Sequence, residues 1–126
     1  MPLSMQWSER SKPVPTTVIK FEGELDSTTS PAATKQLTPK LAEGSSFVEI
    51  DLSGLTLITS AGLGVLIYIS KTLAARGAQS YITNAQPQIQ KVFDIVQAAK
   101  GMSLFSSTKE LDDYLASVQR KMTGGG

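Results

Sequence analysis

Residues 51–66 decide the fold, and they run Asp51-Leu52-Ser53-Gly54-Leu55-Thr56-Leu57-Ile58-Thr59-Ser60-Ala61-Gly62-Leu63-Gly64-Val65-Leu66. This stretch is predicted to pass from a strand, through a short loop, into a helix that begins at or beside Ser60. The first turn of a helix presents backbone N–H groups that have no partner within the helix and that favour an anion. Ser60 therefore stands where a phosphate could be held.

On either side of this stretch, strand patterns and helix patterns alternate along the chain. The helix that begins at Ser60 is apolar nearly all round in its first half, so it should be well buried. With short connections, the alternation predicts an α/β sandwich in which helices cover a sheet with a parallel portion. The predicted strands cover 5–8, 17–25, 47–52, 80–84 and 102–105, and the predicted helices cover 31–43, 60–76, 87–101 and the residues that follow the capping-box sequence at 107–110.

Length and composition indicate one domain with one ordinary core, because the chain has 126 residues and 40% of them are apolar. Residues 1–16 are poorly defined, with a possible edge strand, and the main domain spans 17–122. Residues 123–126 form a glycine tail that should be flexible. We expect a monomer, with a weak dimer as the alternative.

Several classes of function are excluded by residues that the sequence lacks. It contains no cysteine and no histidine, which rules out thiolate catalysis, thiolate zinc sites and a histidine base. Its 12 basic and 11 acidic side chains give a net charge of +1, which provides no field to gather nucleic acid. The longest apolar run, 61–69, is far shorter than the ~18–20 residues that span a bilayer, and the N-terminus does not resemble a secretory signal. We therefore expect a cytoplasmic protein with no membrane partner and no cofactor.

Motifs for enzymatic chemistry are incomplete in this chain. Gly62 and Gly64 suggest a dinucleotide-binding fingerprint, but Ile67 stands where the third glycine is needed. The loop before Ser60 does not end in the Gly-Lys-Ser/Thr of a phosphate-binding loop. A serine-hydrolase elbow would need glycine at Ile58 and a histidine base. No group of residues in the sequence supports a metal site.

Two interpretations of Ser60 arise from its position alone. In one, it is an N-cap or first-turn serine that contributes roughly 1 kcal/mol to helix stability. In the other, it is a modification site, where the helix N-terminus tolerates the ~1.5–2 negative charges of a phosphate. The position leaves both interpretations open.

The stretch 51–66 resembles the signature of the STAS domain, specifically that of the bacterial anti-sigma factor antagonists. The family pattern is a strand that ends in Asp-Leu-Ser, an apolar segment, Asp-Ser-Ser/Ala-Gly-Leu-Gly and a helix. The resemblance covers most of the chain, is weakest before Thr17, and implies a small mixed sheet of four to five strands faced by about four helices. Two further segments are similar to the family's second strand and third-helix entry, namely Phe21-Glu22-Gly23-Glu24-Leu25-Asp26 and Asn84-Ala85-Gln86-Pro87-Gln88-Ile89 with Val92-Phe93.

The resemblance also implies a function. In this family, the serine that matches Ser60 is phosphorylated by an ATPase-fold partner that is both a serine kinase and an anti-sigma factor, and a metal-dependent serine/threonine phosphatase removes the phosphate. The unmodified antagonist binds the kinase and displaces its sequestered target, usually a sigma factor. By this resemblance the chain is a regulatory binding protein rather than an enzyme. The expected partner-binding residues are Asp26, Thr59, Ser60, Ala61, Gly62, Leu63 and Gly64.

One position departs from the family pattern. The residue before the phosphorylated serine is typically aspartate, and here it is Thr59, which removes a charge and adds a second, less favoured acceptor hydroxyl. Asp26 matches a family position close to the serine, but an aspartate there also suits the start of a turn. Gly62 and Gly64 would permit close approach of a partner, or close packing of the helix within the domain.

Two other functions stay open at this point. The chain could be a STAS scaffold, or a module that senses a small ligand or nucleotide, and that is not phosphorylated. It could also be an enzyme that acts through Ser60, although it offers no histidine to activate the hydroxyl. Phosphate transfer from ATP by the cognate kinase would separate the antagonist from both alternatives.

Overall fold

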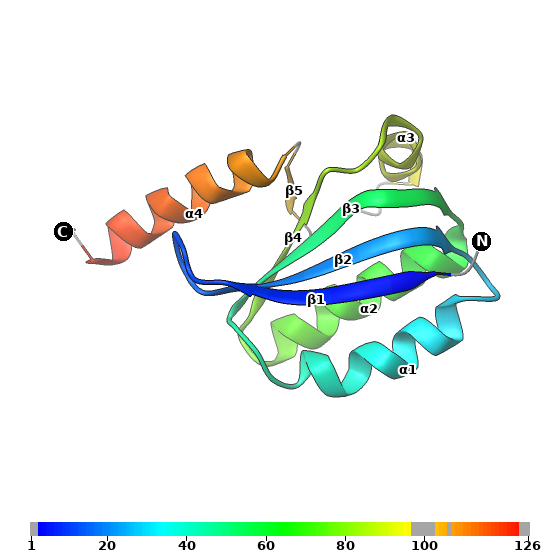
Figure 1. Ribbon diagram of the computed structural model, residues 1–126, viewed down its shortest axis with the longest axis horizontal. Helices are drawn as coiled ribbons and strands as arrows, with labels where there is room; N and C mark the ends of the chain where they lie inside the picture. The colour runs from blue at the N-terminus through cyan, green and yellow to red at the C-terminus, as the bar shows by residue number, and fades with distance from the viewer. Residues whose placement is uncertain (1–2, 97–102, 106, 124–126) are drawn as a thin grey trace.

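The computed structural model describes residues 3–96, 103–105 and 107–123. The strands form one sheet in the order β1-β2-β3-β4-β5, in which β1 is antiparallel to β2 and the other neighbours are parallel. The predicted α/β sandwich with a small mixed sheet is therefore confirmed (Figure 1). The strands are β1 (Ser4–Arg10), β2 (Thr16–Leu25), β3 (Phe47–Ile58), β4 (Gln79–Thr83) and β5 (Ser103–Phe105), and the helices are α1 (Ser30–Leu41), α2 (Ser60–Ala75), α3 (Pro87–Val96) and α4 (Thr108–Thr123).

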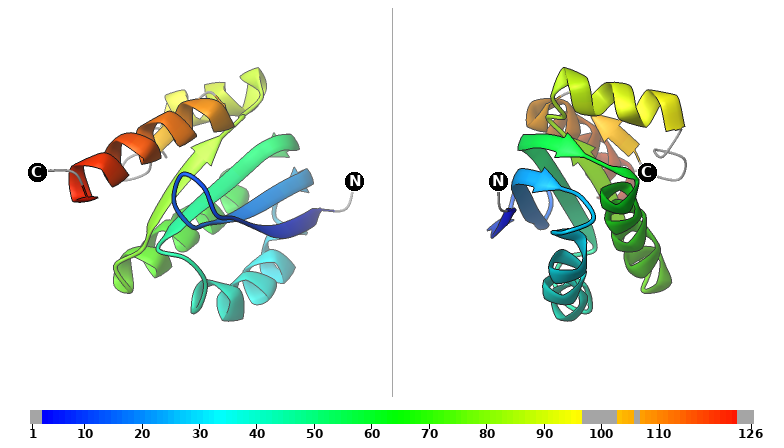
Figure 2. Two further views of the ribbon diagram at one scale, coloured as in Figure 1. Left: turned by 60° about the vertical axis from the view of Figure 1, so that its left-hand side comes forward. Right: turned by 90° about the vertical axis from the view of Figure 1, so that its right-hand side faces the viewer.

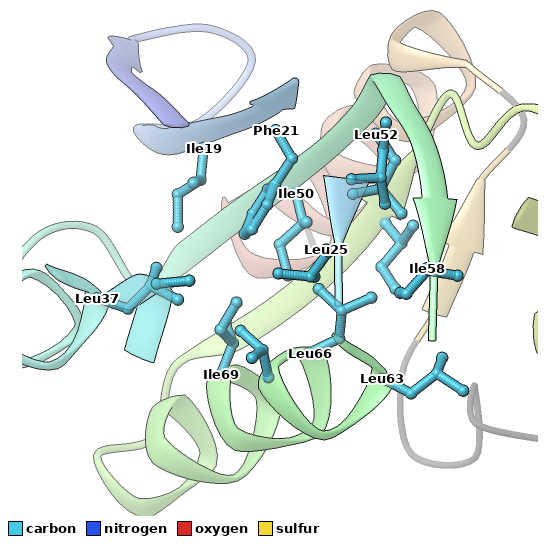
Figure 3. Close-up of a cluster of buried hydrophobic side chains, with 14 of the residues drawn as sticks. Ile19, Phe21, Leu25, Leu37, Ile50, Leu52, Ile58, Leu63, Leu66 and Ile69 are labelled. Atoms are coloured by element: carbon cyan, nitrogen blue, oxygen red, sulfur yellow. The ribbon is translucent and has the colours of Figure 1, made fainter. Parts of the chain in front are cut away.

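The main hydrophobic core lies between one face of the sheet and the helices α1 and α2, which run side by side against it (Figures 1 and 2). Figure 3 shows Leu37 of α1 and Leu66 and Ile69 of α2 on the side of the helices that faces the sheet. These side chains meet Ile19 of β2 and Ile50 of β3, and all five are fully buried. Burial of a side chain of this size contributes about 1.5–3 kcal/mol, so this layer holds α2 firmly against the sheet.

The opposite face of the sheet carries a smaller core beneath α4. Val14, Tyr81, Leu111 and Leu115 are buried together, and Phe47 packs against them. The rings of Phe47 and Tyr81 are stacked with their centroids 6.2 Å apart. Because Leu111 and Leu115 both lie in the first half of α4, this half docks the helix on the sheet.

A buried carboxylate connects several elements on this second face. Glu49 of β3 is 1% exposed, and its Oε1 accepts a hydrogen bond from Arg10 Nη1 at 2.6 Å. Its Oε2 accepts hydrogen bonds from the hydroxyls of Thr83 at 2.7 Å and Thr108 at 2.8 Å. Arg10 Nη2 also lies 2.8 Å from Oδ1 of Asp112. A buried charge is tolerated when it is paired and hydrogen-bonded, and this network joins β1, β3, β4 and α4.

β3 is longer than predicted, which corrects the loop expected before α2. Residues 53–58 continue the strand and pair with β2 as far as Leu25 and Ile58, with two shifts in register on the way. A Cβ atom at Gly54 would lie 2.6 Å from Glu22 Cγ, so the strands approach closely where the chain has glycine. Polar and small residues interrupt the apolar pattern in this half of β3, so the sequence pattern does not predict a strand there.

The other elements differ from prediction mainly at their ends. β1 spans seven residues instead of the predicted 5–8, because it pairs with β2 along its whole length. Predicted helix residues 97–101 and predicted strand residue 102 lie outside the described residues. α4 includes Thr123, which the sequence predicts to be part of the glycine tail, and 124–126 lie outside the described residues.

The cap at the start of α4, and the length and apolar content of the helices, agree with the sequence pattern. The N–H of Glu110 donates to the Ser107 hydroxyl oxygen at 3.1 Å, as the capping-box sequence predicts. Within the described part of the chain, none of the helices combines the length and the apolar character that crossing a membrane requires.

Candidate functional site

The carboxyl ends of β2 and β3 lie side by side, and they place two connections next to each other. The strands pair up to Leu25 and Ile58, and the N–H of Thr59 then donates to the Leu25 carbonyl oxygen at 3.1 Å. The turn at 26–29, which leads into α1, therefore lies beside the point where β3 leads into α2. This edge of a parallel sheet is where α/β proteins commonly place their sites. All of the predicted site residues come from these two connections and the first turns of α2.

Asp26 organises the turn before α1. Its Oδ1 accepts hydrogen bonds from the hydroxyl and the N–H of Thr28 at 2.7 and 2.9 Å, and from the N–H of Thr29 at 3.1 Å. These hydrogen bonds, led by that of the Thr28 hydroxyl, lower the pKa of Asp26 because they favour the charged form. The turn-forming role that the sequence allowed is thus present, and contact of Asp26 with a partner stays a prediction.

Ser60 is the first residue of α2, and it is exposed. Thr59 occupies the N-cap position in an extended conformation, but its hydroxyl caps no backbone N–H. The Thr59 Oγ1 is buried and has no hydrogen-bond partner among the described residues. The N–H of Leu63 bonds to the Thr59 carbonyl oxygen at 2.8 Å, so the N–H groups before Leu63 form the free first turn. Of the two candidate acceptors, Ser60 is the one in an exposed position.

Gly62 and Gly64 differ in what surrounds them. A Cβ atom at Gly62 would lie 2.3 Å from the Leu25 carbonyl oxygen and 2.9 Å from Ile58 Cγ1. Gly62 therefore lets α2 pack closely on the ends of β2 and β3. A Cβ atom at Gly64 would meet nothing within 4 Å. Packing within the domain thus explains Gly62 and does not explain Gly64.

A groove of about 430 Å³ separates the first halves of α1 and α2. Its wall is mostly apolar, with hydroxyl groups contributed from both helices. Ala61 and Gly64 are small, so the groove lies open immediately beside Ser60. The residues that line it are Ser27, Ser30, Pro31, Thr34, Ala61, Gly64, Val65 and Tyr68.

Two exposed apolar side chains near Ser60 are not singled out by the sequence. Leu57, close to the end of β3, is 42% exposed, and Ile67, two turns into α2, is 38% exposed. Ser60, Gly64 and Ile67 follow one another at intervals of four and three, so they share one face of the helix. The expectation that the first half of α2 is well buried therefore holds for Gly62, Leu63, Val65 and Leu66 and not for this face, which α1 and the sheet leave uncovered. The spacing of Ser60, Gly64 and Ile67 predicts that they share one face of the helix, but the exposure of that face depends on where α1 packs.

The structure divides the seven predicted partner-binding residues by exposure. A partner could contact the exposed positions directly, whereas it could reach the buried ones only through their backbone. Their role in binding stays a prediction. Ser60 and Gly64 are exposed; Asp26, Thr59 and Ala61 are half-buried; Gly62 and Leu63 are buried. In the described ranges, no cluster of three or more acidic side chains is placed to hold a metal ion.

Comparison with known proteins assigns the family. The family model of the STAS domain matches residues 8–111. Sequence relatives include the anti-sigma-B factor antagonist of Staphylococcus epidermidis, which is 32% identical over 77 residues, and that of Staphylococcus aureus (strain NCTC 8325 / PS 47), which is 30% identical over 77 residues. Each alignment covers 61% of this chain and 71% of the relative.

Solved structures share the fold at lower sequence identity. An anti-sigma factor antagonist from Mycobacterium paratuberculosis is similar with a TM-score of 0.76 and 20% identity, over 93% of this chain and 94% of that one. A putative anti-sigma factor antagonist from Thermotoga maritima is similar with a TM-score of 0.77 and 15% identity, over 92% of this chain and 95% of that one. The match to the family model spans most of the chain, and it includes the whole of the site around Ser60. The chain therefore belongs to the STAS domain family.

Proposed function

We propose that this protein is an anti-sigma factor antagonist in a partner-switching module. In its unphosphorylated form it binds an ATPase-fold serine kinase that is also an anti-sigma factor, and it releases the target that the kinase sequesters. Phosphorylation of Ser60 blocks this binding, and a metal-dependent serine/threonine phosphatase restores it. Such a module acts in the cytoplasm, where ATP and the transcription machinery are present. The observation that carries the proposal is the exposed Ser60 at the first position of α2.

The surface around Ser60 supports a protein partner. Gly64 and Ile67 lie on the same helix face as Ser60, and the groove between α1 and α2 opens beside them. The exposed Leu57 adds a further apolar group close to the start of the helix. The centres of protein interfaces are apolar and poor in charge, which is the character of this face. In our proposal the kinase covers this face, with Ser60 near the centre of the contact.

A phosphate on Ser60 would act through this contact and without refolding of the domain. The free N–H groups and the dipole of the helix N-terminus favour a negative charge in the unbound protein. Inside the interface, the same phosphate loses water and meets the charges of the partner. Since about 1.4 kcal/mol weakens binding tenfold, a penalty of roughly 3–4 kcal/mol is enough to switch the protein from bound to free.

The proposed role of Ser60 is that of a phosphate acceptor. A serine nucleophile needs an adjacent base, and the chain contains no histidine to serve as one. The names of the sequence relatives also describe an antagonist of a regulatory factor. The competing proposal is a STAS module that binds a small ligand or nucleotide and is not phosphorylated.

Mass spectrometry after incubation with a kinase tests the proposal. The full chain is mixed with magnesium, ATP and the ATPase-fold serine kinase encoded nearest to its gene. We expect one phosphate on the wild-type chain and none on Ser60→Ala. Thr59→Val, which removes the buried hydroxyl without changing the shape, and Ser27→Ala, which removes an exposed hydroxyl beside the groove, should both still gain the phosphate. A phosphate that persists in Ser60→Ala, or no phosphate at all, contradicts the assignment.

A further inference from the structure

The hydroxyl of Thr59 is a buried polar group that makes no hydrogen bond in the unmodified protein. Thr59 lies at the N-cap of α2, directly before Ser60, and its Oγ1 is buried with no hydrogen-bond partner among the described residues. Buried polar groups in folded proteins are nearly always hydrogen-bonded, because an unpartnered one costs free energy. An unpartnered hydroxyl next to the proposed phosphate acceptor therefore needs an explanation.

The protein interior at the start of α2 suits a methyl group better than a hydroxyl. Leu25, Ile58 and Leu63 are buried there, and Figure 3 shows their side chains near the end of β3 and the start of α2. The packing is close, because a Cβ atom at Gly62 would lie 2.3 Å from the Leu25 carbonyl oxygen. Threonine carries a hydroxyl and a methyl on the same carbon, so rotation about its Cα–Cβ bond can place the methyl inside and turn the hydroxyl outward.

On the outer side, the first turn of α2 offers hydrogen-bond donors to the turned hydroxyl. The N–H of Leu63 is the one that bonds to the Thr59 carbonyl oxygen, so the N–H groups of Ser60, Ala61 and Gly62 have no partner within the helix. A threonine at the N-cap usually accepts a hydrogen bond from the second or third of these groups. Thr59 already has the extended backbone conformation of an N-cap, with φ −110° and ψ 179°, so rotation of the side chain alone brings Oγ1 to this position.

We propose that Thr59 is the residue that positions a phosphate on Ser60. After phosphorylation the Thr59 hydroxyl turns outward, accepts a hydrogen bond from an N–H of the first turn and donates its own proton to a phosphate oxygen. A hydroxyl can donate and accept at the same time, and a hydrogen bond to an anion is stronger than one to a neutral group. The phosphate, carried by the first residue of the helix, lies at the same N–H groups. This inference rests on the proposed phosphorylation of Ser60 and adds the residue that holds the phosphate afterwards.

The hydrogen bond from Thr59 has a consequence for the charge of the phosphate. A donor that bonds to the charged form of an acid favours that form, so the second pKa of the phosphate falls. The phosphate is then held in one orientation and as a dianion near neutral pH. A fixed dianion is costlier to bury in an interface than a mobile monoanion, and this strengthens the proposed switch.

Phosphorus NMR of the phosphorylated full chain tests the proposal without a kinase. Phosphoserine is incorporated at position 60 during translation with an expanded genetic code, and the second pKa of the phosphate, ordinarily about 6, is read from a pH titration. We expect this pKa to be about 0.3–0.5 unit higher in Thr59→Val than in the wild-type background, and unchanged in Thr59→Ser, which keeps the hydroxyl. Thr59→Asp, which puts a like charge beside the phosphate, should raise the pKa further than Thr59→Val does.

Ser27→Ala is the matched control, because it removes another hydroxyl beside the groove and should leave the phosphate pKa unchanged. The same pKa with Thr59 and with Thr59→Val overturns the proposal. A rise in Ser27→Ala without a rise in Thr59→Val also overturns it, since the donor is then Ser27. A kinase that leaves Ser60 unmodified contradicts the proposed function instead, and it does not affect this measurement, in which the phosphate is introduced without the kinase.

Urea denaturation gives a second, independent measurement. In the unmodified chain, Thr59→Val replaces an unpartnered buried hydroxyl by a methyl group, so the urea midpoint should rise. Phosphoserine at position 60 should raise the midpoint by more in the wild-type background than in Thr59→Val, because only the hydroxyl can bond to the phosphate. A lower midpoint for unmodified Thr59→Val, or an equal effect of the phosphate in both backgrounds, shows that the hydroxyl does not act through the phosphate and overturns the proposal.

Discussion

At the scale of single residues, Gly62 and Gly64 lie two residues apart in α2, yet a methyl group would have opposite consequences at the two positions. A Cβ atom at Gly62 would overlap the Leu25 carbonyl oxygen, whereas at Gly64 it would meet nothing. We expect Gly64→Ala to raise the free energy of unfolding by about 0.5–1 kcal/mol, because alanine is the better helix former. Gly62→Ala should lower it by about 1–3 kcal/mol, because the helix has to move. Urea denaturation of the two variants measures both changes.

The same pair of variants separates packing from partner contact. If Gly64 serves the approach of the proposed kinase, Gly64→Ala should bind the kinase more weakly although it is more stable. Isothermal titration with the kinase measures this change in affinity. Equal affinity for wild type and Gly64→Ala would show that the partner does not approach at this position.

At the scale of elements, the attachment of α4 depends on Glu49. Removal of its carboxylate takes an ion-pair partner from Arg10 and a hydrogen-bond acceptor from the hydroxyls of two threonines. We expect Glu49→Ala to lower the free energy of unfolding by about 2–4 kcal/mol in urea denaturation. The matched control is Asp113→Ala, which breaks the exposed pair with Lys109 and should change it by less than about 0.5 kcal/mol. A similar small effect of both variants would contradict the structural role of Glu49.

The contact between β4 and α4 also predicts a dependence of stability on pH. Burial, with a smaller contribution from the neighbouring Tyr114, raises the pKa of Tyr81 to about 12 from the ordinary 10.0. The folded state therefore keeps the phenol proton to higher pH than the unfolded state does. The contribution of the Tyr81 phenol to the free energy of unfolding is fully present below pH 10.0 and is lost as the pH rises through about 12. The free energy of unfolding should therefore fall by an amount on the order of 2–3 kcal/mol.

Denaturation of a phenylalanine variant isolates this effect. Tyr81→Phe should lack that part of the fall between pH 10.0 and about 12, whereas Tyr68→Phe, which alters a half-buried tyrosine on α2, should retain it. The difference between each variant and wild type removes the titration of other groups that all three proteins share. Identical alkaline profiles for Tyr81→Phe and wild type would show that the phenol is not responsible.

At the scale of the whole molecule, Ser60 lies at one edge of the sheet and is exposed, outside the main core. A negative charge at Ser60 therefore meets solvent and the helix N-terminus rather than packed side chains. We expect Ser60→Asp to keep the circular dichroism spectrum of wild type and to keep or raise the free energy of unfolding by about 0.3–1 kcal/mol. The same variant should bind the proposed kinase more weakly. Loss of structure in Ser60→Asp would show that a charge acts on the fold and not on the contact.

Much of the architecture follows from patterns that are local in the sequence. Alternation of strands and helices, and the glycine and hydroxyl residues at their ends, predict the α/β sandwich and the helix that begins at Ser60. The second half of β3 cannot be predicted from these local patterns. Its small and polar residues look like a loop, and they form a strand because β2 lies alongside to accept their backbone hydrogen bonds. The pairing partner, and not the local pattern, decides the conformation there.

The candidate site likewise has some features that local sequence predicts and others that depend on how distant elements pack. The sequence by itself determined that a helix begins at Ser60 and that the chain belongs to the STAS domain family, because helix starts and short motifs depend on neighbours along the chain. Only the tertiary structure decided that Thr59 Oγ1 is buried, that Gly62 serves packing while Gly64 faces open space, and that Leu57 and Ile67 are exposed. Exposure depends on which distant elements pack against a residue, and that information is not contained in any short stretch of sequence.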